Sequence, residues 1–553
     1  MKQLTLLLFL VLYSLLASAV PAKRERYTLK LSNGSTIVAT SMGDETMHFY
    51  QTDDGRCLQC DSLGIAHFLE PDSLYNRWQV RAAKRQTARD RRNAARRQKA
   101  RAAMTGSKPG LVILVQFPDV PFYYDNDRFQ RFFNEENYSD ATNSGSVRDF
   151  FLDASYGQFD FYFDVVGPVT VSHNLSYYGA NKSNGEDIRP ATMVEEAIHL
   201  VDDEVDFSKY DWDGDGEVEH IFVIHSGYDE AQNTYYKNNI WSHAWTLSEA
   251  KDEDDGNGAV LADGVIVDGY ATSSELRNGS GTNLVGIGTA CHEFSHCFGL
   301  PDFYDTEGTC FGMNSWDLMD YGSYNNDGGT PAGFTSYERM FCGWLDPIEL
   351  DEPLAVSDMP ALTTEPVAYI LRNTGKHDEY LLLENRQKVS WDKYLGGHGM
   401  LVLHVDYDSE AWYENTVNTV RSHQRMTIIP ADNSLYQGSL GGDPWPGTSK
   451  KKVLSDDTSS YAKFFNNNAE GNKRINHSFT EITETTDGYI SFIFDEEALA
   501  INPATAHTDA AVYDLQGRKV NVQMENIQMV NGKWLNGKCP GIYIQDGKKL
   551  LIR

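Results

Sequence analysis

Two histidines, a glutamate, a glycine and an aspartate lie within eleven residues, His292-Glu293-Phe294-Ser295-His296-Cys297-Phe298-Gly299-Leu300-Pro301-Asp302. On a helix, His292 and His296 are four residues apart and lie on one face, so both imidazoles can bind one tetrahedral Zn²⁺. Glu293 lies between them, beside the metal's open position, where a general base for bound water is expected. Gly299 can take the left-handed conformation that ends a helix, and Asp302 then follows as a candidate third ligand. The pattern predicts a zinc centre with three protein ligands and a fourth position for water.

A second element lies downstream, in Ser315-Trp316-Asp317-Leu318-Met319-Asp320-Tyr321-Gly322. Metzincins carry a turn with a Met packed under the zinc site, and Leu318-Met319-Asp320-Tyr321 resembles that turn. Several such enzymes have a Tyr two residues after that Met, near the metal, and Tyr321 fits that offset. The two elements together predict a metzincin-like site, with Met319 in a structural turn and Tyr321 available to stabilise an oxyanion.

Shorter segments occur in a fixed order around these elements: Gly110–Phe117, Ser146–Phe151, Ser155–Phe159, Ile240–His243, His292–Asp305, Leu383–Gln387, His404–Asp406 and Pro446–Ser449. With them, the chain resembles the M6, or immune inhibitor A-like, secreted metallopeptidases from about residue 107 to 495. The resemblance implies an α/β catalytic domain with a mixed sheet and a zinc-binding helix, followed by β-rich domains. It also implies a secreted zinc endopeptidase that cleaves extracellular proteins or peptides through a zinc-activated water, with Glu293 as general base.

Two alternatives stay open at this point. A catalytically inactive surface adhesin could keep the same fold, although an intact Glu293 argues against it. The third zinc ligand could instead be a more distant acidic residue, as in gluzincins, for which Asp305, Asp317 and Glu338 are candidates. The spacing from Gly299 favours Asp302.

Composition and charge narrow the class of protein. The chain has 553 residues, of which 41% are hydrophobic and 23% charged, as in ordinary globular proteins, so several domains are expected. A net charge of -31 argues against binding to nucleic acid or anionic lipid. Residues 1–19 have the basic start, the apolar stretch and the Ala17-Ser18-Ala19 site of a secretory signal. No later stretch is apolar enough to cross a membrane, so a secreted or surface-attached protein is expected.

The remaining chain is expected to form four parts. Residues 20–106 are predicted to be a propeptide with a small β-rich unit, which ends in a stretch from 81 to 101 that holds ten Lys or Arg residues and one Asp. We interpret that stretch as a protease-sensitive junction and expect the propeptide to keep the enzyme latent. The catalytic domain is placed at 107–345, with strands at 110–117 and 221–225 and helices at 146–154 and near 331–341. A β-rich extension is placed at 346–498.

Residues 509–553 resemble the C-terminal sorting domains of the type IX secretion system of Bacteroidetes. The resemblance rests on Ala511–Val520, Leu535–Ile544 and the turn at Asp546-Gly547-Lys548-Lys549 before a last apolar strand. It implies the secretion machinery as a partner. The alternative is a terminal β module without a sorting role.

A second metal site is predicted in Asp211-Trp212-Asp213-Gly214-Asp215-Gly216-Glu217-Val218-Glu219. Carboxylates from Asp211, Asp213, Asp215, Glu217 and Glu219, with a glycine at the sixth position, can wrap a short loop around Ca²⁺. The twelfth position of an EF-hand should be Glu but is Phe222, so the loop is not an EF-hand. A solvated acidic turn is the alternative.

Seven cysteines leave an odd number for pairing. Cys291 adjoins His292, but its side chain points about 100° away around the helix, so it is not a ligand candidate. Disulfides or buried thiols are expected, with undetermined connectivity. Cys57 or Cys60 could block the open zinc position in a latent form, although pairing with each other is favoured.

Overall fold

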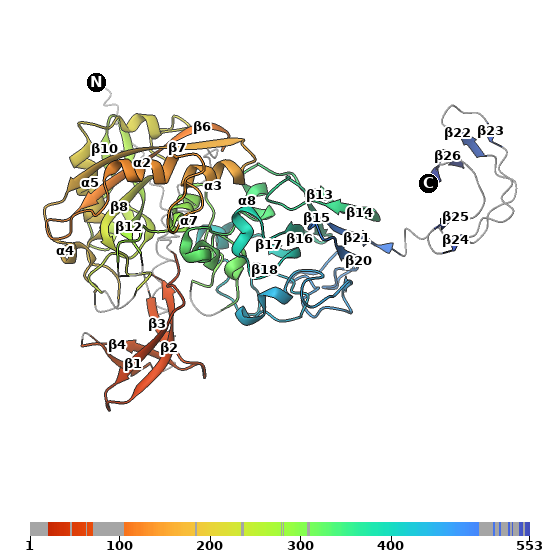
Figure 1. Ribbon diagram of the computed structural model, residues 1–553, viewed down its shortest axis with the longest axis horizontal. Helices are drawn as coiled ribbons and strands as arrows, with labels where there is room; N and C mark the ends of the chain where they lie inside the picture. Colours follow the sequence, from red (N-terminus) through yellow and green to blue (C-terminus); the bar gives the residue numbers. More distant parts are fainter. Residues whose placement is uncertain are drawn as a thin grey trace, which may run out of the picture. The chain divides into compact units, whose positions relative to one another are not determined.

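The computed structural model describes residues 20–44, 47–61, 63–69, 104–182, 185–233, 237–277, 279, 281–306 and 310–496, and six strands between 512 and 552. The chain separates into two compact units, residues 1–496 and 497–553. The predicted signal segment and the Arg-rich stretch lie outside the described residues. Within the first unit, the sheet and helices that position the histidines belong to residues 106–341 (Figure 1).

A five-stranded mixed sheet forms the centre of this part. Its order is β7 (Phe159–Thr170), β6 (Gly106–Gln116), β8 (Ile221–Tyr228), β12 (Gly269–Leu276) and β9 (His243–Thr246). The first four strands pair in parallel, and β9 is antiparallel to β12. The two strands predicted at 110–117 and 221–225 are therefore present, and the predicted mixed sheet is confirmed.

Helices cover both faces of this sheet because β6 is apolar on both sides. Val112 and Leu114 face a core that includes α2 (Asn126–Asn134), α3 (Val147–Ala154) and α7 (Ile287–Cys297). The alternate residues Leu111, Ile113 and Val115 face a second core with α4 (Leu175–Gly179), α5 (Pro190–Val201), η1 (Phe207–Tyr210) and α6 (Leu247–Asp252). A continuous apolar run of this kind is typical of a strand buried on both faces. A short hairpin, β10 (Val260–Ala262) and β11 (Val265–Val267), also joins the second core.

Three short helices follow α7: η2 (Asn314–Trp316), η3 (Tyr321–Gly328) and α8 (Ser336–Phe341). The segment η3 packs closely on α7, and a side chain at Gly288 of α7 would place its Cβ 2.0 Å from the carbonyl oxygen of Ser323. Only glycine permits that approach. The helix predicted near 331–341 begins later than expected because Thr335 caps it, with Glu338 completing a capping box.

Residues 346–496 form the predicted strand-rich extension. One sheet has the order β13 (Ile348–Glu349), β15 (Ala368–Asn373), β16 (Lys376–Arg386), β17 (Gly399–Asp406) and β18 (Met426–Ile428). A second has β14 (Leu354–Met359), β21 (Ile490–Phe494), β20 (Ser478–Glu484) and β19 (Leu454–Ser455). Leu382 and Leu401 join the core that contains α7, while Leu381 and Val402 on the opposite face join the core between the two sheets. The connecting helices are η4 (Ser390–Tyr394), α9 (Ser409–Tyr413) and η5 (Gln437–Gly442).

Residues 26–68 form a small closed barrel, drawn in red in Figure 1, which fits the predicted β-rich unit. Its strands are β1 (Arg26–Leu31), β2 (Thr36–Asp44), β3 (Met47–Gln51), β4 (Cys57–Cys60) and β5 (Ile65–Phe68). The barrel contacts the sheet-containing part through His48, whose ring stacks on Trp241 with 5.5 Å between centroids. Lys237 adds a hydrogen bond of 3.0 Å from Nζ to the carbonyl oxygen of Cys60.

The second unit contains only short strands among its described residues. Four of them form a sheet in the order β23 (Lys519–Val520), β22 (Val512–Asp514), β26 (Gly541–Gln545) and β27 (Lys548–Ile552). The remaining pair is β24 (Met529–Val530) and β25 (Lys533–Trp534). The predicted last apolar strand corresponds to β27. The similarity to sorting domains stays a prediction.

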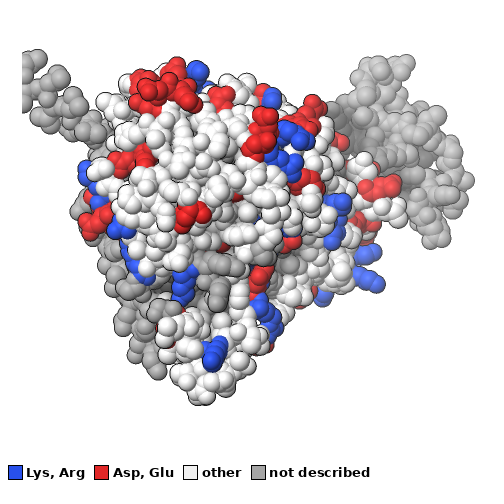
Figure 2. Space-filling view, turned by 60° about the vertical axis from the view of Figure 1, so that its left-hand side comes forward, with Lys and Arg blue, Asp and Glu red and all other residues white. Residues whose placement is uncertain are grey.

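Acidic side chains outnumber basic ones, and on the face in Figure 2 they gather in groups among uncharged surface. None of the helices that the structure describes has both the length and the apolar composition needed to cross a bilayer.

Candidate metal centre

The helix α7 places both histidines in the protein interior. His292 is 0% exposed and His296 is 4% exposed. The helix ends at Cys297, and Gly299 follows with a φ of 83°, which confirms the predicted left-handed end. This turn directs the chain back toward the helix and brings Asp302 opposite the two imidazoles.

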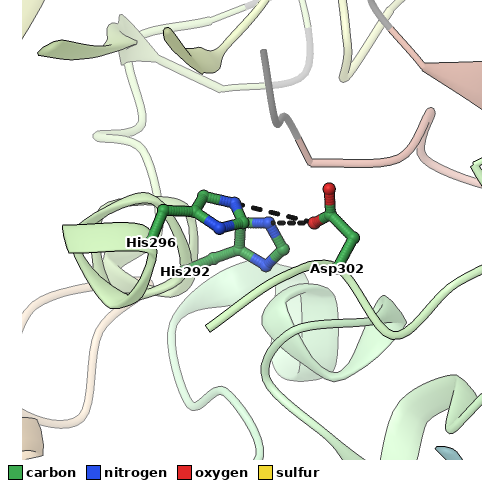
Figure 3. A group of neighbouring side chains, drawn as sticks. All are labelled: His292, His296 and Asp302. Carbon is green, nitrogen blue, oxygen red and sulfur yellow. Dashed lines mark ion pairs between the residues drawn. The ribbon is translucent and has the colours of Figure 1, made fainter. Parts of the chain in front are cut away.

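The three predicted ligands converge, as Figure 3 shows. Oδ1 of Asp302 lies 3.1 Å from Nε2 of His292 and 3.6 Å from Nε2 of His296. Zinc bonds of about 2.0–2.1 Å in a tetrahedron place neighbouring ligand atoms about 3.3 Å apart, close to both distances. The donor set of two imidazole nitrogens and one carboxylate oxygen is also one that zinc accepts.

The hydrogen bonds of the two rings fix which nitrogen carries the proton. Nδ1 of His292 lies 2.8 Å from the carbonyl oxygen of Leu318, and Nδ1 of His296 lies 2.8 Å from that of Leu300. A carbonyl oxygen only accepts, so each Nδ1 is the donor and each neutral ring carries its lone pair on Nε2. Burial lowers the pKa of His296 to about 4, which keeps that ring neutral.

Asp302 is held as a carboxylate. Burial raises its pKa, but the hydrogen bond from the amide of Asn415 is among the interactions that oppose this, and the pKa lies below its usual value. Asn415 binds Asp302 twice: Nδ2 donates to Oδ2 at 2.6 Å, and Oδ1 accepts the Asp302 N–H at 2.7 Å. The remaining Oδ1 and both Nε2 atoms have no hydrogen-bond partner in the part of the chain that the structure describes. Three converging electron-rich atoms, all buried, fit a bound cation such as Zn²⁺.

The segment with Met319 contacts both His292 and the loop that carries Asp302. Met319 is fully buried, and its carbonyl oxygen accepts the N–H of Phe303, one residue after Asp302, at 2.8 Å. The preceding residue, Leu318, supplies the carbonyl that orients His292. The turn therefore ties one histidine and the loop of the carboxylate to the same short stretch of chain.

The alternative ligands lie elsewhere. Oδ2 of Asp305 accepts the N–H of Cys310 at 3.1 Å. Asp317 and Glu338 are buried beside each other: Asp317 accepts the N–H of Met319 at 2.7 Å, and burial raises its pKa to about 7. None of these three residues belongs to the group formed by the two histidines and Asp302.

Glu293 is fully buried and contacts Val20, the first residue that the structure describes. Its Oε1 accepts the backbone N–H of Val20 at 3.2 Å. Trp241 Nε1 donates to the carbonyl oxygen of Val20, also at 3.2 Å. Figure 3 shows this segment as a faint red ribbon beside the three ligands. The predicted propeptide thus contacts the predicted general base directly.

Tyr321 is the first residue of η3, and Arg24 covers it. The Arg24 guanidinium lies 3.8 Å from the centre of the Tyr321 ring. Burial raises the pKa of Tyr321, although Arg24 opposes this in part, so the phenol keeps its proton and its ability to donate a hydrogen bond.

The acidic loop brings together three of its five predicted ligands, Asp211, Asp213 and Glu219. Asp215 instead accepts the N–H of Glu217 at 3.0 Å. Burial, followed by the charges of Asp213 and Asp211, raises the pKa of Glu219 to about 7. Three carboxylates that repel one another in a group of this size form a candidate cation site.

The sequence did not indicate three residues of this region. Asn415 belongs to the extension, 113 residues after Asp302, and carries no motif. Trp241 was noted only as part of a family segment. His220, next to Glu219, is buried with both ring nitrogens lacking hydrogen bonds among the described residues, and burial together with the nearby His296 lowers its pKa to about 3.

Six cysteines are described, and the structure records each as a free thiol: Cys57, Cys60, Cys291, Cys297, Cys310 and Cys342. Burial raises the pKa of Cys291 and of Cys297 well above the usual value, which keeps both protonated. Cys291, Cys310 and Cys342 are buried thiols, one of the two predicted alternatives, whereas Cys57, Cys60 and Cys297 are half-buried. The favoured pairing of Cys57 with Cys60 is wrong, since both are free thiols.

Comparison with known proteins agrees with this geometry. Residues 108–344 match the family described as immune inhibitor A peptidase M6, catalytic domain. Immune inhibitor A of Bacillus thuringiensis subsp. alesti is 26% identical over 290 residues, which cover 44% of this chain and 41% of that protein. Pre-pro-metalloprotease PrtV of Vibrio cholerae serotype O1 (strain M66-2) is 25% identical over 281 residues, which cover 42% of this chain and 29% of that protein. The match thus spans less than half of either relative. For residues 108–344, the resemblance to the M6 peptidase family predicted from the sequence is confirmed.

Proposed function

We propose that this protein is a secreted zinc endopeptidase that hydrolyses peptide bonds of extracellular proteins. The observation that carries the proposal is the convergence of His292, His296 and Asp302, with both Nε2 lone pairs and a carboxylate oxygen directed at one point. The resemblance to the M6 peptidase domain supports the same conclusion. The three residues would hold the metal, and the adjacent Glu293 would act in the chemistry.

The chemistry that zinc supplies at such a site is Lewis-acid activation of a water and of the scissile carbonyl. Glu293 accepts the proton of the attacking water and delivers it to the nitrogen of the leaving amine. Tyr321, which keeps its phenolic proton, donates a hydrogen bond to the oxyanion. Met319 and Leu318 act indirectly, because they hold His292 and the Asp302 loop in place.

We further propose that the segment from Val20 keeps the enzyme latent. Val20 and Ala22 are fully buried, and the Val20 nitrogen engages Glu293, so neither water nor a substrate can use that carboxylate. A cut after Ala19, as the sequence predicts, would make this nitrogen the α-amino group of the chain. A chain that begins at Val20 should therefore hydrolyse peptides far more slowly than one that begins near Ser107. Equal specific activity, with the longer chain shown to remain uncut, would rule out latency.

We assign Ca²⁺ to the loop of Asp211, Asp213 and Glu219. Glu219 and its neighbour His220 lie close to the C-terminal end of α7, since Glu219 raises the pKa of Cys297 and His296 lowers that of His220. Binding would relieve the repulsion between the three carboxylates and stabilise this end of the zinc helix. The sorting role of residues 509–553, and a partner in a secretion machinery, stay predictions from the sequence.

The test of the peptidase function is casein hydrolysis by the processed protein, with and without a zinc chelator. Hydrolysis that the chelator abolishes and added Zn²⁺ restores is the expected result. A protein that binds one zinc per chain but cleaves neither casein nor peptides would instead favour the inactive adhesin on the same fold.

A further inference from the structure

Residues 20–24 run across the site and bind it through backbone groups that any peptide carries. Three hydrogen bonds join this backbone to the peptidase part: Trp241 Nε1 to the Val20 carbonyl at 3.2 Å, the Tyr324 hydroxyl to the Pro21 carbonyl at 3.0 Å, and the Lys23 N–H to the Ala231 carbonyl at 3.0 Å. These contacts do not depend on the side chains of residues 20–24. A peptide substrate could therefore follow the same path and make the same backbone hydrogen bonds.

The contact with Glu293 sets the position of each residue relative to the reacting bond. In the proposed reaction, Glu293 protonates the nitrogen of the leaving amine, and that nitrogen belongs to the first residue after the cleaved bond. The nitrogen that lies at Glu293 is that of Val20, 3.2 Å from Oε1. Val20 thus occupies the first position after the bond, and Lys23 and Arg24 occupy the fourth and fifth.

Both basic side chains have partners in the peptidase part or the extension. Nζ of Lys23 lies 3.1 Å from Oδ1 of Asp327. Arg24 stacks on Tyr321 at 3.8 Å, and its Nη1 donates to Oε1 of Gln437 at 3.0 Å. These partners lie outside residues 20–106, so a chain without those residues still carries them. They offer a carboxylate, and separately an aromatic ring with an amide oxygen, to a peptide that follows the path of residues 20–24.

We propose that these partners form two substrate subsites that select basic residues at the fourth and fifth positions after the cleaved bond. The proposal rests on the peptidase function above and names a class of substrate for it. Asp327 is half exposed and also pairs with Arg277 at 2.9 Å, so its subsite is the weaker of the two. The Tyr321–Gln437 subsite suits Arg better than Lys, because a planar guanidinium stacks on a ring and donates along its edge.

The chain itself contains segments that fit this pattern. The site holds Ala22-Lys23-Arg24, and the Arg-rich junction repeats it as Ala83-Lys84-Arg85 and, with one conservative change, as Ala95-Arg96-Arg97. Placing these two basic pairs in the fourth and fifth positions identifies the bonds Val80–Arg81 and Arg92–Asn93. The remaining pair, Arg91-Arg92, follows Asp90 instead of Ala and identifies the bond Thr87–Ala88. Hydrolysis adds one water to each bond and leaves a carboxylate on the first residue and an amine on the second. The junction that releases the blocking segment is thus a substrate of the enzyme it blocks.

The test uses the full chain with Glu293→Gln as an inert substrate and a trace of self-processed wild-type protein as enzyme. New N-termini, identified by mass spectrometry, are expected at Arg81 and Asn93, and at Ala88 for the pair Arg91-Arg92. Lys84→Ala with Arg85→Ala should slow the first cut at least about fivefold and leave the second unchanged, since exposed ion pairs and cation–π contacts are individually modest. Arg96→Ala with Arg97→Ala should slow the cut before Asn93 and leave the cut before Arg81 unchanged. Each substrate is thus the control of the other.

Enzyme variants test the subsites themselves. The enzyme with Asp327→Asn and Gln437→Leu should cut the unaltered substrate and the substrates without a basic pair at similar rates. Casein is digested in parallel to show that the enzyme is active. Casein hydrolysis with cuts elsewhere in the junction, or with rates that ignore the basic pairs, would overturn the subsites alone. Absence of casein hydrolysis would overturn the peptidase function, and the subsites with it.

Discussion

Replacing Asn415 with Ala should weaken zinc binding although Asn415 does not touch the metal position. Its amide holds Asp302 at two points, 2.6 Å from Oδ2 and 2.7 Å from the backbone nitrogen. Asp302 is fully buried, so the carboxylate has no water to replace the lost donor. The carboxylate would then be free to turn away from the two imidazoles, and its ionised form would lose support.

The magnitude follows from the kind of bond that is lost. A hydrogen bond to a charged group contributes about 1.5–3 kcal/mol, and each 1.4 kcal/mol corresponds to a factor of about ten in affinity. Asn415→Ala should therefore raise the Kd for zinc by about 10- to 100-fold, which is the range typical of groups that orient metal ligands.

The assay is a competition titration of zinc against a chelator of known affinity, with circular dichroism to confirm that the variant is folded. Asn433→Ala is the matched control. Asn433 also has a left-handed backbone, with a φ of 61° against 50° for Asn415, and its amide holds Ser459 and Ser460 rather than Asp302. An unchanged zinc affinity in Asn415→Ala, or an equal loss in Asn433→Ala, would refute the reasoning.

Three further predictions concern the metal sites and the buried carboxyl pair. Asp302→Ala should lose zinc and activity together, and full zinc stoichiometry in that variant would remove Asp302 from the ligand set. Ca²⁺ should raise the melting temperature of the wild type but not of Asp213→Ala, because binding to the folded state alone stabilises it; an equal rise in both would show that the loop is only a turn. Burial raises the pKa of Asp317 from 3.8 to about 7, so over that window the folded chain holds a proton that the unfolded chain has lost, and stability falls as pH rises. Asp317→Asn should accordingly keep its zinc and gain in melting temperature over the wild type from pH 5 to pH 8, and a gain that does not grow with pH would contradict this.

The three candidate zinc ligands could be predicted from the sequence because local geometry brings them together. A spacing of four positions places His292 and His296 on one helix face, and a single glycine with positive φ returns the chain to Asp302. The strand at β6 was equally clear, since five consecutive apolar residues can only be buried on both faces of a sheet. In both cases the information lies within about ten residues.

What the sequence did not indicate depends on contacts between distant segments. The hold of Asn415 on Asp302 follows only when the extension has packed on the peptidase part. In the acidic loop, the third member of the group with Asp211 and Asp213 is Glu219, while Asp215 accepts the N–H of Glu217. Alternation of carboxylates along the chain could not show which of them share a centre. The latent arrangement was expected, but the contact of Val20 with Glu293 was not, because no motif marks a chain start that folds back 273 residues.

The most direct test of the proposed function is the zinc content and the activity of Glu293→Gln measured on the same processed preparation. The substitution keeps the size of the side chain and leaves His292, His296 and Asp302 unchanged, while it removes the group that moves the proton. We predict about one zinc per chain, as in the wild type, and a turnover of casein at least about 100-fold lower. Near-normal turnover with zinc bound would contradict the role of Glu293, and loss of zinc with the protein still folded would contradict the ligand set.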